Sequence, residues 1–233
     1  MKRRDLLKAG LGLPLFSHAG IALAEPGLQR VYAQPNASMP PTLPRDHGAH
    51  PAFRTEWWYF TGWFESPALS QPLGVQITFF RSAPNVNVLN PSAFSPKQLL
   101  FAHAAVAIPS VGKLKHDQII RRAGSGGALI QSTNEQVLNI QMPGWQLQSA
   151  QGEQWECKIQ TPQLSIDLRM EQTQTPWMQG LGGYSQKGPQ AEQSSYYITL
   201  PHMRSSGTVR LEGKTLPVQG SFWMDHEWSS TVL

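Results

Sequence analysis

Apolar and polar residues alternate along most of the chain after residue 45, with the period of two that is typical of β-strands with one buried face. The clearest case is 164–171, in which Leu164, Ile166, Leu168 and Met170 are each followed by a polar residue. This pattern predicts strands over 57–64, 73–81, 99–107, 138–142, 155–159, 164–171, 194–200, 207–211 and 218–228.

Turn signals separate these segments, and most of them contain glycine or proline. Examples are Pro143-Gly144, Gly182-Gly183 and Gly188-Pro189. After residue 45 we find no segment with a convincing helical period. Many short strands with turns between them predict an all-β sandwich or barrel, and the many aromatic residues favour a barrel.

Residues 1–24 have the pattern of a twin-arginine export signal, followed by a lead-in. The pair Arg3-Arg4 precedes two leucines and a lysine, and a moderately apolar stretch ends in the small-x-small sequence of 22–24. We expect cleavage near Glu25, passage through an export system and a periplasmic or secreted protein. Residues 25–44 are rich in proline, alanine, serine and glutamine, which predicts an extended lead-in to a domain over 45–233.

Charge and composition exclude several classes of protein. The chain has 233 residues, a net charge of +4 and a pI near 9.3, but residues 1–24 alone carry +3. The remainder is close to neutral, so we expect no nucleic-acid partner. The single cysteine, Cys157, excludes an internal disulfide, and no apolar run is long enough to span a membrane.

The first group of residues that suggests chemistry begins at Arg54. On a strand, Glu56 and Trp58 share one face with Arg54, while Trp57 and Tyr59 lie on the other. A carboxylate beside an indole loses hydration, so its pKa should rise unless Arg54 pairs with it, and a raised pKa suits a general acid. The alternative is a structural Arg54–Glu56 ion pair.

A metal site is a second interpretation of this region. It would require Asp46, His47 and His50 together with a further donor such as His103, but this spacing matches no standard signature. We favour a polar loop, and we expect neither a metal nor a cofactor.

The second group lies near the end of the chain. On a strand, His226 and Trp228 point one way, while Trp223, Asp225 and Glu227 point the other. A protonatable imidazole beside an indole face is a plausible acid site. A structural histidine, and acidic residues that pair with lysine or arginine, are the alternatives.

Other candidates offer less. Cys157 lies on the apolar face of an alternating strand and is expected to be inert packing. His103 lies in an apolar strand, where it either lines a cavity or bonds a backbone carbonyl. Serine-hydrolase elbows, Walker loops and dinucleotide-binding fingerprints are missing from the sequence.

From residue 46 onward the sequence resembles the AttH/CrtC lipocalin-like family, which groups predicted secreted hydrolases, AttH-type periplasmic proteins and carotenoid 1,2-hydratases. The matching segments include 46–62, 182–188 with 195–197, and 223–230. The resemblance implies a lipocalin-like antiparallel β-barrel, the first of two barrels in the family. The second would lie beyond Leu233, so the domain over 45–233 is expected to be truncated at its C-terminus.

The resemblance also implies a site. In carotenoid hydratases of this family a His-x-Trp pair is implicated in catalysis, and it corresponds to His226 and Trp228. We therefore expect action on a hydrophobic, isoprenoid or lipid-like molecule, by acid-catalysed hydration or by hydrolysis. The alternative is a periplasmic binding or carrier protein for such a molecule. The expected catalytic residues are His226, Trp228, Glu56, Asp225 and Glu227, and the expected ligand-binding residues are Trp57, Trp58, Tyr59, His103 and Trp223.

Self-association is a further expectation from the sequence. If the segment 218–228 normally leads into a second barrel, then its apolar surface and strand edge would be uncovered here. We therefore expect dimerisation or aggregation through the C-terminal strands.

Overall fold

A single antiparallel sheet dominates the computed structural model, which describes residues 30–86, 89–92, 94–109, 112–133 and 137–231. The predicted export signal over 1–24 lies outside these residues. The described strands are β1 (Thr55–Glu65), β2 (Leu73–Ser82), β3 (Leu99–Ile108), β4 (Lys113–Arg122), β5 (Leu129–Gln131), β6 (Leu138–Met142), β7 (Trp145–Ser149), β8 (Gln154–Gln160), β9 (Leu164–Gln172), β10 (Trp177–Met178), β11 (Tyr184–Gln186), β12 (Ser194–Leu211) and β13 (Lys214–Ser229).

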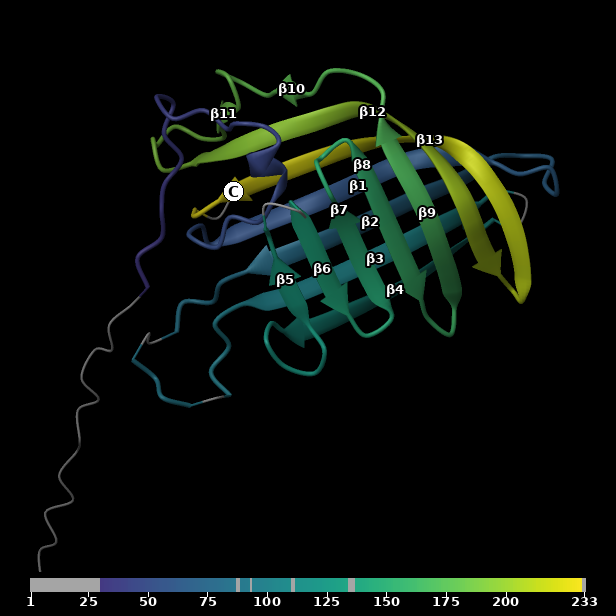
Figure 1. Cartoon of the computed structure of the whole chain (residues 1–233), viewed down its shortest axis with the longest axis horizontal. Coiled ribbons are helices and arrows are strands. Elements are labelled where there is room, and N and C mark those ends of the chain that lie inside the picture. The colour runs from purple at the N-terminus through teal and green to yellow at the C-terminus, as the bar shows by residue number, and fades with distance from the viewer. Residues whose placement is uncertain (1–29, 87–88, 93, 110–111, 134–136, 232–233) are drawn as a thin grey trace, which may run out of the picture.

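The strands follow the order β4-β3-β2-β1-β13-β12-β9-β8-β7-β6-β5, and the short strands β10 and β11 pair with β12. In Figure 1, β6–β9 cross in front of β1–β4, while the long strands β12 and β13 curve from one layer towards the other. The sheet therefore forms a half-barrel, and the expected all-β, lipocalin-like fold is confirmed.

The core lies between the two layers and is filled by side chains. Alternate residues of each strand point into it, as the sequence pattern predicts, and most of them are aromatic or branched. Trp58, Phe79, Trp155 and Phe222 are among the largest of these side chains, and each has 0–1% of its surface exposed. Cys157 is buried among them as a free thiol, and burial raises its pKa, which agrees with inert packing.

Most strands lie where the alternation predicts them, with informative exceptions. The segments 194–200 and 207–211 belong to one strand, β12, whose pairing with β13 shifts between Leu200 and Met203. Pro201 lies at this shift and has no N–H to donate to a ladder. The pattern did not reveal β4, β5, β7, β10 or β11. The strand β4 was missed because it ends the sheet and leaves Leu114 and Ile120 more than half exposed.

The described part of the lead-in covers one end of the barrel. Residues 30–44 contain no helix or strand, but the Asn36 N–H bonds the Tyr196 hydroxyl at 3.0 Å. The Ala33 N–H bonds the Ala52 carbonyl at 3.0 Å. A short 3-10 helix, η1 (Arg45–His47), then leads into the loop before β1.

Most of the C-terminal strand has partners on both of its edges in the described residues. β13 pairs with β1 along one edge and with β12 along the other. The edge that faces β1 is paired over 219–229 and unpaired over 214–218, and self-association through the C-terminal strands stays a prediction. Among the described residues no helix is long and apolar enough to cross a membrane.

Candidate functional site

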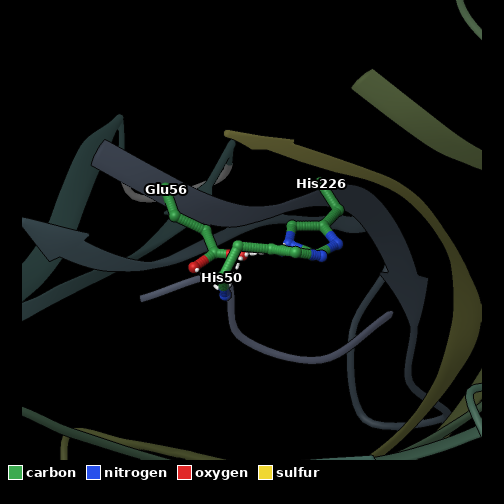
Figure 2. Close-up of side chains that lie close together, drawn as sticks. All are labelled: His50, Glu56 and His226. Carbon is green, nitrogen blue, oxygen red and sulfur yellow. Dashed lines mark hydrogen bonds and ion pairs between the residues drawn. The ribbon is translucent and has the colours of Figure 1, made fainter. Parts of the chain in front are cut away.

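A fully buried carboxylate lies at the centre of the candidate site. Glu56 on β1 has 0% of its surface exposed, and it accepts hydrogen bonds from residues of three other segments. Its Oε1 lies 2.6 Å from His50 Nδ1 and 2.9 Å from His226 Nε2, and its Oε2 lies 2.8 Å from Arg81 Nε. The backbone N–H of His50 adds a contact of 2.9 Å. Figure 2 shows the two imidazole rings meeting at this carboxylate.

The register of the sheet brings these residues together. Glu56 is opposite Arg81 on β2 and opposite Trp228 on β13, and the next inward position of β1, Trp58, is opposite His226. All of these side chains point inward because each strand alternates its faces. His50 comes from the loop after η1 and reaches Glu56 from outside the sheet.

Indole rings enclose the two imidazoles. The Trp228 ring stacks on His50 with centroids 3.8 Å apart and an interplanar angle of 5°. The Trp58 ring stacks on His226 at 4.7 Å, and its Nε1 donates to the His47 carbonyl at 3.1 Å. These flat apolar faces limit how water reaches the cluster and can stabilise a nearby cation.

The pKa values of the three titratable residues in the cluster shift in different directions. Burial alone would raise the pKa of Glu56, but His50, His226 and Arg81 together hold it well below its usual value. Burial lowers the pKa of His50, yet Glu56 and Asp46 outweigh burial and raise it. Burial lowers the pKa of His226, and Glu56 offsets this only in part. At neutral pH the arrangement favours an ionised Glu56, a protonated His50 and a neutral His226.

These charges determine which nitrogen of His226 is open. An ionised carboxylate only accepts hydrogen bonds, so Nε2 of His226 carries the proton in the contact with Glu56. The other nitrogen, Nδ1, is then an acceptor, and it has no partner among the described residues. Trp228 Nε1 is a buried donor that likewise has no partner there. The site therefore holds a base, His226 Nδ1, and a donor, Trp228 Nε1, on neighbouring rings. The centroids of these two rings are 4.7 Å apart.

The prediction that Glu56 has a raised pKa is wrong. Arg54 is not its partner; Arg81 forms the ion pair from the neighbouring strand, with 0% of either side chain exposed. The hydrogen bonds and this cation outweigh the desolvation that the sequence argument considered. Glu56 thus orients both histidines and favours the charged form of His50, rather than donating a proton itself.

Several predicted site residues lie on the opposite face of the sheet from His226. Glu227 pairs with Lys187 at 2.8 Å and accepts from the Ser195 hydroxyl at 2.5 Å. Asp225 accepts from the Thr199 hydroxyl at 2.6 Å. The other outward residues are Trp57, Tyr59, His103 and Trp223. This agrees with the structural alternative for the two acidic residues, and the structure brings neither of them to the cluster.

Sequence reasoning missed the roles of Arg81, His50 and Asp46. Arg81 is a charged residue in a strand whose other inward positions are all apolar, and that signal was available. His50 was considered only as a metal ligand, and its contact with Glu56 depends on the path of the loop. Asp46 Oδ1 lies 3.4 Å from His50 Nε2, and although burial raises its pKa, Arg45, His50 and Thr42 together lower it.

The same residues have the donor types of a metal site. Ligand atoms of His50, Glu56 and His226 lie within 4.8 Å of one another, and two histidines with a glutamate suit zinc. Arg81 already supplies a cation to the carboxylate. Asp46 and His103, which the sequence argument grouped with His50, differ in position: Asp46 is beside His50, while His103 stacks on Phe80 on the outer face.

Comparisons with known proteins identify the family. The sequence profile of AttH-like proteins matches residues 34–233. A crystal structure of an AttH protein from Nitrosomonas europaea is 39% identical over 86% of this chain, with a TM-score of 0.77. The chain belongs to the AttH-like family. The expected family resemblance is therefore confirmed.

This AttH-like chain spans 59% of the length of the Nitrosomonas protein. The crystal structure of kievitone hydratase from Nectria haematococca is also similar, with a TM-score of 0.59, 88% of this chain covered and 57% of that chain. Its sequence identity is 10%, so this likeness shows the fold alone. Among curated proteins, none matches the chain.

Proposed function

We propose that this protein is an exported enzyme that adds water to, or hydrolyses, a hydrophobic isoprenoid or lipid-like molecule by proton transfer at His226. The observation that carries the proposal is the state of this imidazole, whose Nε2 is held by Glu56 while Nδ1 is an open base. Membership of the AttH-like family and the hydratase-like fold support it.

The chemistry of hydration uses both protonation states of His226. In its protonated form Nδ1 gives a proton to one alkene carbon, the π electrons form the new C–H bond, and a cation develops on the neighbouring carbon. The oxygen of a water molecule bonds to this cation, and the surplus proton returns to Nδ1. The sum is one alkene and one water giving one alcohol, with His226 restored.

The lowered pKa of His226 fits the first step. Protonating carbon demands a strong acid, and an imidazolium whose pKa is lowered by burial is a stronger acid than a free one. Glu56 keeps Nε2 bonded throughout, so the ring returns to the same tautomer. The faces of Trp58 and Trp228 are suited to stabilise the developing cation.

An apolar cluster beside the histidines suits the hydrophobic part of a substrate. Tyr196, Ile198 and Trp228 pack together there, with Leu43 and Phe53 against them. Glu56 and His226 are fully buried and the His50 side chain is 15% exposed, so entry requires the covering segment 30–54 to move. The same apolar cluster would serve a carrier protein, which is the competing function.

Incorporation of labelled oxygen tests the proposal. The protein is incubated in water enriched in oxygen-18 with lycopene or geranylgeraniol in detergent micelles, and products are analysed by mass spectrometry. We expect labelled alcohol from the wild type and from His116→Ala, an exposed control on β4, but none from His226→Ala. Binding of the substrate by His226→Ala should stay within about tenfold, roughly 1.4 kcal/mol. Binding without labelled product in the wild type would favour the carrier and contradict hydration of these isoprenoids.

A further inference from the structure

A separate cavity of about 770 Å³ lies on the outer surface of the sheet, along β1, β13, β12, β9, β8 and β7. Its volume falls in the range of about 300–1,000 Å³ that is common for small-molecule sites. None of the residues that line it belongs to the His50–Glu56–His226 cluster, whose side chains point to the other face. We call this cavity the outer trough.

An uncovered indole lies at one end of the outer trough. Trp63 points outward from β1 and is 58% exposed, although tryptophan is usually largely buried. Its partners across the neighbouring strands are Gly74 on β2 and Ser221 on β13, and Gly62 precedes it. These small residues leave the ring without side chains to cover it. A bare indole offers a flat surface that packs against the C–H groups of a ligand.

Planar polar groups line the rest of the outer trough. Arg204 pairs with Glu171, and Arg169 Nε lies 3.6 Å from Glu156 Oε1. The Gln148 amide donates to Glu156 Oε2 at 3.0 Å. Such groups hold donors and acceptors in fixed directions, which suits a ligand that has both.

The charge of the lining narrows the class of ligand. The lining contains two arginines, Arg169 and Arg204, and three glutamates, Glu65, Glu156 and Glu171. It therefore carries one net negative charge. This balance disfavours a phosphate or another anion, and the density of polar groups disfavours an apolar ligand. A neutral ligand with many hydroxyl groups and an apolar face meets both conditions.

We propose that the outer trough binds a neutral oligosaccharide, with one sugar ring stacked on Trp63 and hydroxyl groups bonded to the arginine, glutamate and glutamine side chains. A pyranose ring has C–H groups on its face and hydroxyls at its rim, which matches an indole beside planar polar groups. This binding is distinct from the proposed reaction, because it uses the opposite face of the sheet.

Isothermal titration calorimetry on the full chain tests this inference with cellopentaose, maltopentaose and chitopentaose. We expect at least one of them to bind with a Kd tighter than about 1 mM, the scale of a weak specific complex. Trp63→Ala should weaken that binding at least tenfold, and Arg204→Met should weaken it as well. The matched control is Trp177→Ala, because Trp177 is 55% exposed on β10 but does not line the trough. It should bind like the wild type.

Three outcomes would overturn the inference. The first is that none of the three oligosaccharides binds the wild type. The second is that Trp63→Ala and Arg204→Met bind as the wild type does, or that Trp177→Ala loses binding equally. The third is that an anionic heparin pentasaccharide binds more tightly than the neutral sugars, which would contradict the charge argument. Because His226→Ala leaves the trough intact, its sugar binding should be unchanged even if it abolishes the proposed reaction.

Discussion

Glu56 is an anion without exposed surface, and its stability in the fold depends on its partners. Moving a carboxylate from water into a protein interior is costly, and only good geometry with additional hydrogen bonds repays it. Arg81 neutralises the charge, and two imidazoles and one backbone N–H occupy the remaining lone pairs. Removing either Glu56 or Arg81 alone would therefore leave an unpaired buried charge.

Replacing this carboxylate by an amide should destabilise the fold strongly. In Glu56→Gln the buried guanidinium of Arg81 loses its counter-charge, and we expect the free energy of unfolding to fall by about 3–5 kcal/mol. Glu171→Gln is the matched control, because it breaks an exposed pair with Arg204 and should change stability by less than about 1 kcal/mol. Urea unfolding followed by tryptophan fluorescence measures both. Equal effects of the two variants would contradict a special role of Glu56.

The buried histidines predict how stability depends on pH. Burial, with a further contribution from His226, lowers the pKa of His47 to about 3 from an ordinary 6.5. Below pH 6.5 the unfolded chain therefore binds a proton that the folded chain does not, so stability falls as the pH drops towards 3. His226 acts in the same direction. His50 acts oppositely, because its raised pKa stabilises the fold below 6.5 and this contribution is lost as the pH rises through the raised value.

Removing His47 should weaken the dependence of the free energy of unfolding on pH below about pH 6.5. We expect His47→Asn to be less stable than the wild type at pH 7, but to lose less further stability between about pH 6.5 and pH 4. Urea midpoints across this range provide the measurement, and His116→Asn on the exposed edge strand is the control. If both variants keep the slope of the wild type, the neutral state assigned to buried His47 is incorrect.

At the scale of elements, the close pairing of β1 with β13 determines the site, because these strands carry Glu56 and His226. Gly62 on β1 lies directly against the backbone of β13. A Cβ at Gly62 would lie 2.0 Å from the Ser221 carbonyl oxygen, whereas a Cβ at Gly74 would meet only Ala107 Cβ at 3.5 Å. There is therefore no room for a side chain at Gly62, whereas Gly74 can accept one.

Alanine at these two glycines should separate the effect of close approach from that of glycine itself. We expect Gly62→Ala to lower the free energy of unfolding by about 1–3 kcal/mol, because β13 must shift, and to change the near-UV circular dichroism of the core aromatics. Gly74→Ala should be nearly neutral by both measurements. A similar loss in both variants would mean that strand entropy rather than packing is responsible.

At the scale of the whole molecule, the sheet joins parts of the chain that are far apart in sequence. β1 pairs with β13, so Thr55 meets Ser229, and the pairing cannot form before the last strand is present. Sheets that depend on such non-local pairings fold slowly and expose apolar strands meanwhile. A route that exports folded proteins suits such a molecule, which supports the proposed twin-arginine export.

A conservative double substitution tests this route. Arg3→Lys with Arg4→Lys keeps the positive charge but removes the paired arginines, and we expect the protein to accumulate in the cytoplasm. Fractionation and immunoblotting would measure this in cells whose general secretory route is blocked. Normal export of the double variant in those cells would show that the arginine pair is not the signal.

The local features of this protein could be predicted from its amino-acid pattern. The alternation placed Glu56 with Trp58 on one face, and His226 with Trp228 on the face opposite to Asp225 and Glu227. It also predicted the β class and most strands, since each strand records the burial of its own two faces with a period of two. Strand β4 escaped because an edge strand has little burial to record.

Which distant groups meet depends on how the sheet closes. Arg81 rather than Arg54 pairs with Glu56, because the register between β1 and β2 sets the neighbour across the strand and no local pattern encodes that register. His50 reaches the carboxylate through the path of a loop, which has no period to interpret. The pKa of Glu56 depends on all these partners together, so its direction follows from the closed sheet and not from the residues beside it in sequence.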